Sequence, residues 1–262
     1  MKLLWIALSA TAAFAQTKSL SCEQASRRES RQVNLCEMRE QTIAYGGRLS
    51  VDAGRNGGVS VKGWDGAGVL VRSKVDAWGN DDGAARIVMS QVHVDFSAGE
   101  LRASGPEHAD NQWWSVSYEV FVPRIADLSL KAHNGAISIA DVRGNIQFDT
   151  TNGAVNLKNL GGDVEGTTKN GALNITLAGN RWDGTKLDAR TKNGAVNVSM
   201  PQNYSAHFET ATTNGNVNAN FDVVVQGNLT ERRNKKLNTD VGGGGPTVHV
   251  ETTNGTINLK KI

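Results

Sequence analysis

The sequence predicts an all-β protein, a single-chain β-solenoid or β-helix of repeats of about 20 residues, with a less regular amino-terminal half. The main observation is a phrase that occurs seven times: Asn-Gly, a small residue, an aliphatic residue, Asn or Ser, and then a second aliphatic residue or Ala. From the second copy on, the copies start 18, 18, 23, 21 and 40 residues apart, and the last gap equals about two repeats. The phrase opens at Asn56, Asn134, Asn152, Asn170, Asn193, Asn214 and Asn254.

The second observation is the alternation of apolar and polar residues after each Asn-Gly. Successive side chains of a strand point to opposite faces, so Val155 and Leu157 share one face and Asn156 takes the other. A unit of this size cannot bury its apolar face alone, which means that the repeats must stack on one another. The equivalent pairs that should build the core are Val59 and Val61, Ile137 and Ile139, Leu173 and Ile175, Val196 and Val198, Val217 and Ala219, and Ile257 and Leu259.

The Asn-Gly pairs themselves indicate where the chain turns. Both residue types tolerate positive φ, which is what a tight reversal or a solenoid corner requires. The same signal is also typical of two-residue β-hairpins. A meander of antiparallel hairpins therefore stays open as an alternative to the solenoid.

The polar position between the two aliphatic residues allows two interpretations. Stacked copies could join these side chains into a hydrogen-bonded ladder, as regular in-register strands do. Equally, they could be independent polar groups on a solvated sheet face. The residues concerned are Ser60, Ser138, Asn156, Asn174, Asn197, Asn218 and Asn258.

The first half of the chain alternates in the same way but at irregular spacing. Strands are expected over residues 48–61, 69–75, 92–96, 101–103 and 116–122, and a polar loop over residues 105–112. No Pro- or Ser-rich linker divides the chain. Residues 46–262 are therefore predicted to form one β-repeat domain, whose regular array starts at about residue 128.

A single helix is expected in this half. Asp81 and Asp82 precede Gly83 and can cap a helix amino terminus. The apolar residues that follow recur at helical spacing up to about Gln91.

The first fifteen residues have the character of a secretory signal peptide. Lys2 precedes an apolar run, and Ala13-Phe14-Ala15 forms a small-x-small cleavage site before Gln16. The run is too short for a stable membrane anchor, and no later stretch reaches the 18 or so apolar residues of a membrane-spanning helix. We therefore expect an exported protein, periplasmic or secreted to the cell surface, with no membrane span.

The chain has only two cysteines, Cys22 and Cys36. In an oxidising compartment they are expected to form a disulfide that staples a cap over residues 16–45. Attachment of a lipid to Cys22 is the alternative, although the usual aliphatic residue three positions before the cysteine is absent.

Composition and motifs exclude several function classes. The net charge is +2 and the basic residues are dispersed, whereas a nucleic-acid-binding domain presents a concentrated basic face. No nucleophile, phosphate-binding or metal-ligand motif occurs, so no catalytic residue, metal ligand or cofactor is predicted. The carboxylates that coiling could gather for a polysaccharide-cleaving site do not recur at the repeat period: Asp141, Asp149, Asp163, Glu165, Asp183 and Asp188.

The chain resembles the bacterial putative-adhesin family, a domain family of unknown function. The resemblance rests on Asn56-Gly57-Gly58-Val59-Ser60-Val61 with Gly63-Trp64-Asp65, on Trp114-Ser115-Val116-Ser117-Tyr118 leading to Val122-Pro123, and on the Asn-Gly phrases with Leu160-Gly161-Gly162-Asp163-Val164 between them. It extends from about Cys36 to Lys260. It implies a β-solenoid of the cell envelope, without a proven ligand.

These observations favour a non-enzymatic envelope scaffold or adhesin-like binding module. Its partner would be an extended glycan or a surface protein, and the oligomeric state is not predicted. Exposed indoles stack on sugars and contribute strongly to interfaces, so Trp78, Trp113 and Trp182 are candidates for a ligand surface. Trp64 and Trp114 are interpreted as covers for the ends of the core. The alternative function is a carbohydrate-active solenoid enzyme that acts on a polysaccharide.

Overall fold

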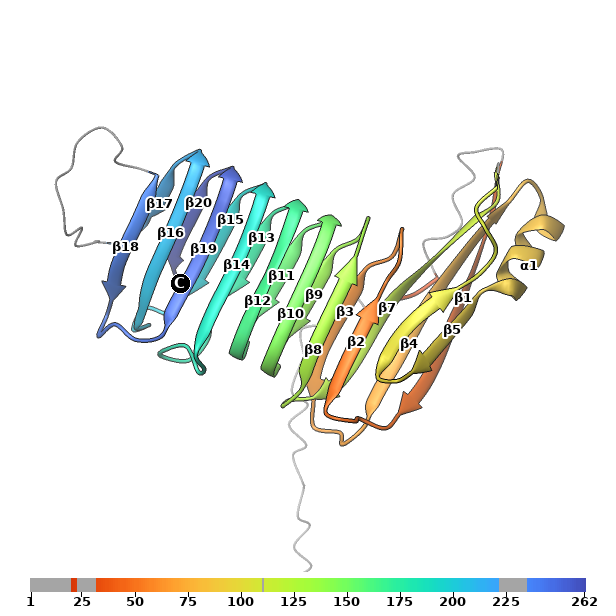
Figure 1. The fold of residues 1–262 in the computed structure, drawn as a ribbon, viewed down its shortest axis with the longest axis horizontal. Helices are drawn as coiled ribbons and strands as arrows, with labels where there is room; N and C mark the ends of the chain where they lie inside the picture. Colours follow the sequence, from red (N-terminus) through yellow and green to blue (C-terminus); the bar gives the residue numbers. More distant parts are fainter. Residues whose placement is uncertain (1–19, 23–31, 110, 222–234) are drawn as a thin grey trace, which may run out of the picture.

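The structure is a computed structural model that describes residues 20–22, 32–109, 111–221 and 235–262. Two ten-stranded sheets run along an elongated molecule and enclose one core between them (Figure 1). The expected signal peptide, residues 1–15, lies outside the described residues. Within the described part of the chain, no helix has the length and apolar character that a membrane crossing requires.

Each sheet is defined by the spatial order of its strands. Sheet A consists of β1 (Val33–Ile43), β4 (Val69–Gly79), β7 (Trp113–Pro123), β3 (Val59–Trp64), β9 (Ile137–Ala140), β11 (Val155–Lys158), β13 (Leu173–Thr176), β15 (Val196–Met200), β20 (Ile257–Lys261) and β17 (Val217–Ala219). Sheet B consists of β18 (Lys236–Val241), β16 (Ala206–Asn214), β19 (Thr247–Asn254), β14 (Lys186–Asn193), β12 (Gly161–Asn170), β10 (Arg143–Asn152), β8 (Asp127–Ala132), β2 (Arg48–Asp52), β6 (Glu100–Ser104) and β5 (His93–Ser97).

The repeats are coils of a parallel β-solenoid. Each coil contributes one strand to sheet B and the following strand to sheet A, and equivalent residues of neighbouring coils are paired. Val155 on β11 is opposite Ile137 on one side and Leu173 on the other, with parallel pairing on both sides. This register confirms the solenoid. The hairpin meander is wrong, because it requires antiparallel pairing between successive repeats.

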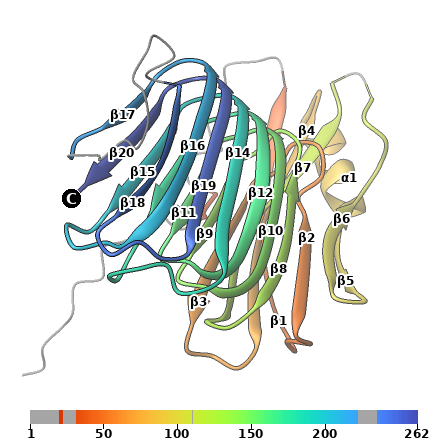
Figure 2. The same cartoon turned by 60° about the vertical axis from the view of Figure 1, so that its left-hand side comes forward.

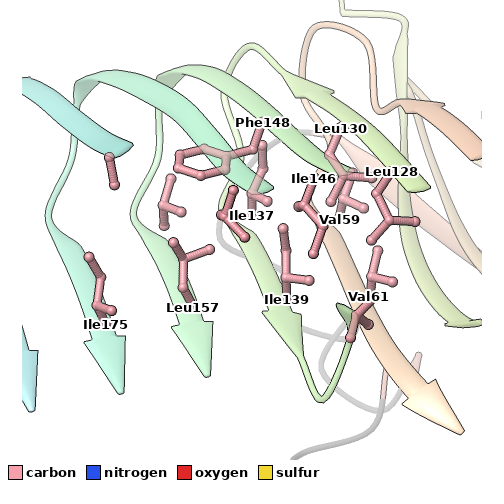
Figure 3. Close-up of a cluster of buried hydrophobic side chains, with 14 of the residues drawn as sticks. Val59, Val61, Leu128, Leu130, Ile137, Ile139, Ile146, Phe148, Leu157 and Ile175 are labelled. Atoms are coloured by element: carbon pink, nitrogen blue, oxygen red, sulfur yellow. The ribbon is translucent and has the colours of Figure 1, made fainter. Parts of the chain in front are cut away.

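The core follows the predicted alternation. Val155, Leu173 and Ile137 are fully buried, and the second aliphatic residue of each phrase lies beside them, as Figure 3 shows for Ile139, Leu157 and Ile175. Each fully buried aliphatic side chain stabilises the folded state by roughly 1.5 to 3 kcal/mol before chain entropy is counted. The pair on β17 is the exception: Val217 is half-buried and Ala219 is exposed, because β17 is the edge strand of sheet A.

The glycine of each Asn-Gly pair has a different role from the predicted one. Positive φ occurs at none of these described Asn or Gly residues, so the turn signal was correctly placed but wrongly explained. The glycines lie directly over one another. A Cβ on Gly153 would sit 2.0 Å from the carbonyl oxygen of Gly135, and one on Gly171 would sit 2.0 Å from that of Gly153. Glycine is required because backbones of successive coils approach too closely for any side chain.

Two ladders of polar side chains run along the solenoid. The Asn residues that open the phrases form the corner ladder, in which each amide donates to the next, such as Asn152 Nδ2 to Asn134 Oδ1 at 2.8 Å and Asn170 Nδ2 to Asn152 Oδ1 at 2.7 Å. The polar position of the phrase forms the face ladder, where Asn174 Nδ2 donates to Asn156 Oδ1 at 2.9 Å and Asn156 Nδ2 donates to Ser138 Oγ at 3.2 Å. The ladder interpretation is therefore confirmed from Ser138 on.

Buried threonines reinforce the same corner. Thr150 Oγ1 donates to the carbonyl oxygen of Gly135 at 3.0 Å, and Thr168 Oγ1 donates to that of Gly153 at 2.9 Å. Both threonines are almost completely buried. Each hydroxyl thus gives a hydrogen-bond donor to the glycine carbonyl that lies against the glycine of the next coil. These hydrogen bonds link consecutive coils.

The coils do not stack in the order of the chain. The last coil, β19 and β20, lies between the coil of β14 and β15 and the coil of β16 and β17 (Figure 2). β18 then pairs antiparallel with the outer side of β16, so that β18 and β19 hold β16 between them. The gap of 40 residues in the sequence contains β18 and the return of the chain.

The amino-terminal half extends both sheets beyond the regular coils. β7 continues sheet A in parallel beside β3, and β4 and β1 follow in antiparallel order. The predicted helix is confirmed as α1 (Asp82–Gln91), and the side chain of Asp81 accepts a hydrogen bond from the backbone of Ala84 at its amino terminus. Ala85 and Val88 are buried on the side of α1 that packs against β4.

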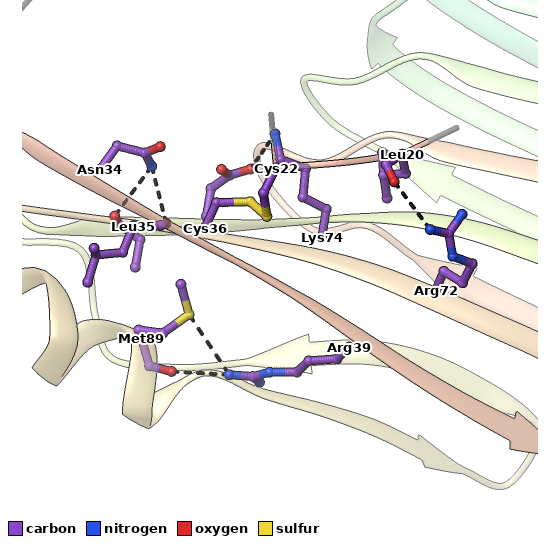
Figure 4. Close-up of a disulfide and its surroundings, with 11 residues drawn as sticks. Leu20, Cys22, Asn34, Leu35, Cys36, Arg39, Arg72, Lys74 and Met89 are labelled. Carbon is purple, nitrogen blue, oxygen red and sulfur yellow. Dashed lines mark hydrogen bonds and ion pairs between the residues drawn. A yellow bond between two sulfur atoms is a disulfide. The ribbon is translucent and has the colours of Figure 1, made fainter. Parts of the chain in front are cut away.

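The predicted disulfide between Cys22 and Cys36 is present (Figure 4). It fixes residues 20–22 to β1, and the guanidinium of Arg72 donates a further hydrogen bond to the carbonyl oxygen of Leu20. Disulfides persist in oxidising compartments, so this bond supports an exported location.

Candidate binding surface

A depression on the outward face of sheet B has a volume of about 530 Å³. Its lining comes from four neighbouring strands, β10, β12, β14 and β19. The residues that precede the corner ladder form one row of it: Thr151, Lys169, Lys192 and Thr253. The register Thr168 to Thr191 and Asn170 to Asn193 places Lys169 beside Lys192.

The two lysines give this row its electrostatic character. Neighbouring strands lie about 4.8 Å apart, and two ammonium groups held at that spacing would repel each other by about 1 kcal/mol in water. Neither Lys169 nor Lys192 forms an ion pair with any residue that the structure describes. We refer to Thr151, Lys169, Lys192 and Thr253 as the lysine row. An anionic group bound between the ammonium groups would remove this repulsion.

The next row of the same face carries two carboxylates and one guanidinium, so its net charge is negative. It contains Asp149, Thr167, Arg190 and Glu251, with a carboxylate at each end. Thr167 Oγ1 donates to Asp149 at 2.9 Å, and Arg190 donates to both oxygens of Asp188 at 2.8 and 2.7 Å. The unpaired positive charge of the depression therefore comes from the lysine row.

The structure brings Glu165 and Asp188 to paired positions on β12 and β14. Of the carboxylates considered for a glycosidase site, these two are directly opposite each other in the described register. Glu165 forms an ion pair with Lys186 at 3.1 Å, and Asp188 also contacts His249 Nδ1 at 3.1 Å. Burial alone raises the pKa of Asp188, but the hydrogen bonds and charges of Arg190 and His249 outweigh it, so the pKa is lowered. The general acid of a glycosidase needs a raised pKa.

The three candidate tryptophans have different positions. Trp78 and Trp113 are cross-strand neighbours on β4 and β7 and stack with ring centroids 3.4 Å apart. Trp182 is only 3% exposed, and its indole nitrogen donates to the carbonyl oxygen of Gly162 at 3.0 Å. Trp182 is therefore a core residue that cannot belong to a ligand surface, which leaves Trp78 and Trp113 as candidates.

Two further tryptophans are predicted to cover the ends of the core; Trp114 does pack against it, whereas Trp64 contacts Phe121, which lies outside the core cluster. Trp64 Nε1 donates to Gly68 at 3.0 Å, and Trp114 donates to the carbonyl oxygen of Pro106 at 2.9 Å.

Sequence reasoning missed the lysine row. The signal was present, since the residue before each Asn of the phrase is His133, Thr151, Lys169, Lys192, Thr213 or Thr253 in the regular coils. Only the register shows that the two lysines are adjacent. Among the described residues, no group of three or more His, Cys, Asp or Glu side chains is placed to hold a metal ion.

Comparison with solved structures finds proteins that align over most of this chain. The "putative cell adhesion protein" of Clostridium sporogenes is 13% identical, with a TM-score of 0.44 over 87% of this chain and 100% of the other. The "putative adhesin" of Bacteroides fragilis is 11% identical, with a TM-score of 0.31 over 86% and 97%. The "putative lipid binding protein" of Parabacteroides distasonis is 12% identical, with a TM-score of 0.29 over 86% and 96%. None of the curated proteins matches the sequence.

The match to a family is more decisive. The Toastrack DUF4097 family matches residues 40–260, which include the seven Asn-Gly phrases and both sheets. Since that match extends over most of the sequence, this protein belongs to the Toastrack DUF4097 family.

Proposed function

We propose that this protein is a non-enzymatic, exported binding module that holds an acidic glycan across the coils of sheet B. The observation that carries the proposal is the lysine row, where two unpaired ammonium groups from neighbouring coils lie in a shallow depression. An acidic polysaccharide carries a negative charge on successive sugars, so neighbouring sugars could contact Lys169 and Lys192.

The fold suits such an extended partner. Stacked coils repeat every 4.8 Å or so, and a polymer that lies across them meets an equivalent strand at each step. The Thr hydroxyls at both ends of the lysine row, Thr151 and Thr253, can donate to or accept from sugar hydroxyls. The corner ladder beside this row fixes the register of the coils. The protein backbone therefore loses little conformational entropy when a ligand binds.

The alternative, a carbohydrate-active enzyme, has weaker support. Two of its candidate carboxylates, Glu165 and Asp188, are engaged in ion pairs, and the pKa of Asp188 is shifted away from that of a general acid. The proposed module therefore binds without releasing product. Formation of new reducing ends from a bound polysaccharide would favour the enzyme instead.

The test is the double variant K169Q/K192Q, assayed for binding to polygalacturonate at low and moderate ionic strength. Each exposed charge contact contributes up to about 1 kcal/mol, so the loss of both should weaken binding about tenfold. The dependence on salt should also decrease. Isothermal titration calorimetry measures both quantities.

The matched control is K158Q/K260Q, which removes the same charge from the outward face of sheet A. Lys158 and Lys260 are exposed and lie on β11 and β20, on the opposite side of the solenoid. This control should bind as the unmodified protein does. Equal weakening in the two double variants would mean that overall charge, and not the lysine row, governs binding, and the proposal would fail. Tight binding to an acidic peptide in place of the glycan would identify a protein partner and would also contradict it.

A further inference from the structure

The corner ladder has a direction, and this direction leaves a free donor at one end. Every amide donates toward the amino-terminal half: Asn214 to Asn254, Asn254 to Asn193, Asn193 to Asn170, and so on to Asn134, which donates to Asn56 Oδ1 at 2.9 Å. Asn56 is the last acceptor. Its own Nδ2 donates to no residue that the structure describes.

The reason lies in the strand that follows. Beyond β3, sheet A continues with β7, which does not begin with an Asn-Gly phrase. The parallel register of Val59 with Tyr118 places Ser115 where the next amide of the ladder would be. β7 still approaches closely, since a Cβ on Gly57 would sit 1.9 Å from the carbonyl oxygen of Val116. The backbone stack therefore continues at this point, whereas the amide ladder stops.

A second depression opens where the ladder ends. It has a volume of about 410 Å³, and Arg55, Asn56, Glu107, His108 and Trp114 line it, with the buried Ala53 at its base. The indole of Trp114 is held in place by its hydrogen bond to Pro106, and the His108 ring meets it edge-on at a centroid distance of 6.0 Å. An amide donor, a guanidinium and a carboxylate thus converge beside an aromatic ring.

The chemistry of the ligand follows from these groups. Hydrogen bonds that run in one direction polarise one another, which makes the terminal N–H of Asn56 a stronger donor than an isolated amide. That donor and the Arg55 guanidinium both require an acceptor, and a carboxylate satisfies them best. Glu107 can accept from hydroxyl groups, and the Trp114 ring offers an apolar surface of the kind that sugar rings contact.

We propose that this depression is a binding site for a single carboxylate-bearing sugar, with Asn56 and Arg55 holding the carboxylate. We call it the Asn56 site. It is a different depression from the one that holds the lysine row and does not depend on the function proposed for that row. A ligand of this class would enter from solvent, because Arg55, Glu107 and His108 are exposed.

The probe is glucuronate, and its binding is measured by NMR from the chemical shifts of the side-chain amides. Glucose is the uncharged comparison. We expect glucuronate to shift the side-chain amide signals of Asn56 at millimolar concentrations. Asn56→Asp keeps the oxygen that accepts from Asn134 but replaces the donor by a negative charge. Binding of glucuronate should fall at least tenfold in this variant.

The matched control is Asn214→Asp at the opposite end of the ladder. It introduces the same negative charge far from the Asn56 site, although it also removes the hydrogen bond from Asn214 to Asn254, so its affinity for glucuronate should stay close to that of the unmodified protein. Arg55→Gln is the second variant, for use if Asn56→Asp does not fold. It leaves the ladder untouched and should also weaken the binding of glucuronate. Unchanged affinity in Asn56→Asp, or equal affinity for glucose and glucuronate, would overturn the proposal.

Discussion

Replacement of Val155 by Asp should unfold the solenoid. Val155 is fully buried on β11 and contacts the equivalent residues of the coils on both sides. An unpaired carboxylate at this position either loses its hydration or becomes protonated at a large cost, and we expect the free energy of unfolding to fall by about 5 kcal/mol or more. That loss is comparable with the whole stability of a typical domain. Leu173→Asp should have the same effect, measured by circular dichroism during thermal denaturation.

The neighbouring residue provides the control. Asn156 lies on the outward face of the same strand, and the equivalent position of the preceding coil is Ser138. Asn156→Ser replaces one hydrogen-bonding side chain of the face ladder by another that the ladder already contains, so the change should stay within about 1 kcal/mol. Similar losses of melting temperature in Val155→Asp and Asn156→Ser would show that the two faces are wrongly assigned.

The second large effect is expected for Gly171→Ala. The added Cβ would lie 2.0 Å from the carbonyl oxygen of Gly153 and 2.5 Å from its carbonyl carbon. Both atoms belong to the backbone, so two coils must separate along hydrogen bonds on both sheets. Overpacking usually costs about 1–3 kcal/mol and here should reach the upper end or exceed it. The melting temperature should fall by about 10 °C.

Gly46→Ala is the matched control for this substitution. A Cβ at Gly46 meets no atom within 4 Å, and the backbone there does not adopt positive φ. Its melting temperature should therefore change little. If Gly171→Ala is equally mild, the coils are more loosely stacked than the structure has them, and glycine is not required by close approach.

Much of the fold could be predicted because it is written into local patterns. Alternation assigned Val155 and Leu157 to the core and Asn156 to the outside, since strand geometry alone decides the face of a side chain. The start of α1 could be predicted from Asp81 because capping involves only the first turn of the helix.

The remaining features depend on contacts between distant segments. The stacking glycines are required by backbone approach between coils, so the sequence indicates a turn but not this reason for it. The burial of Trp182 depends on the loop between β13 and β14 folding back onto Gly162. The lysine row and the Asn56 site also depend on register, which places residues of different coils side by side.

The displaced position of β19 and β20 has a consequence for synthesis. A ribosome releases the coil of β16 and β17 before the last coil exists, and the phrases at Asn193 and Asn214 are equivalent, so the incomplete chain offers two surfaces that match each other. The finished protein instead requires Asn254, made 61 residues after Asn193, to lie between them. The nascent solenoid therefore cannot be completed simply by adding coils in order. β16 gains its parallel partner only once β19 has been made, and direct pairing of β14 with β16 would exclude β19.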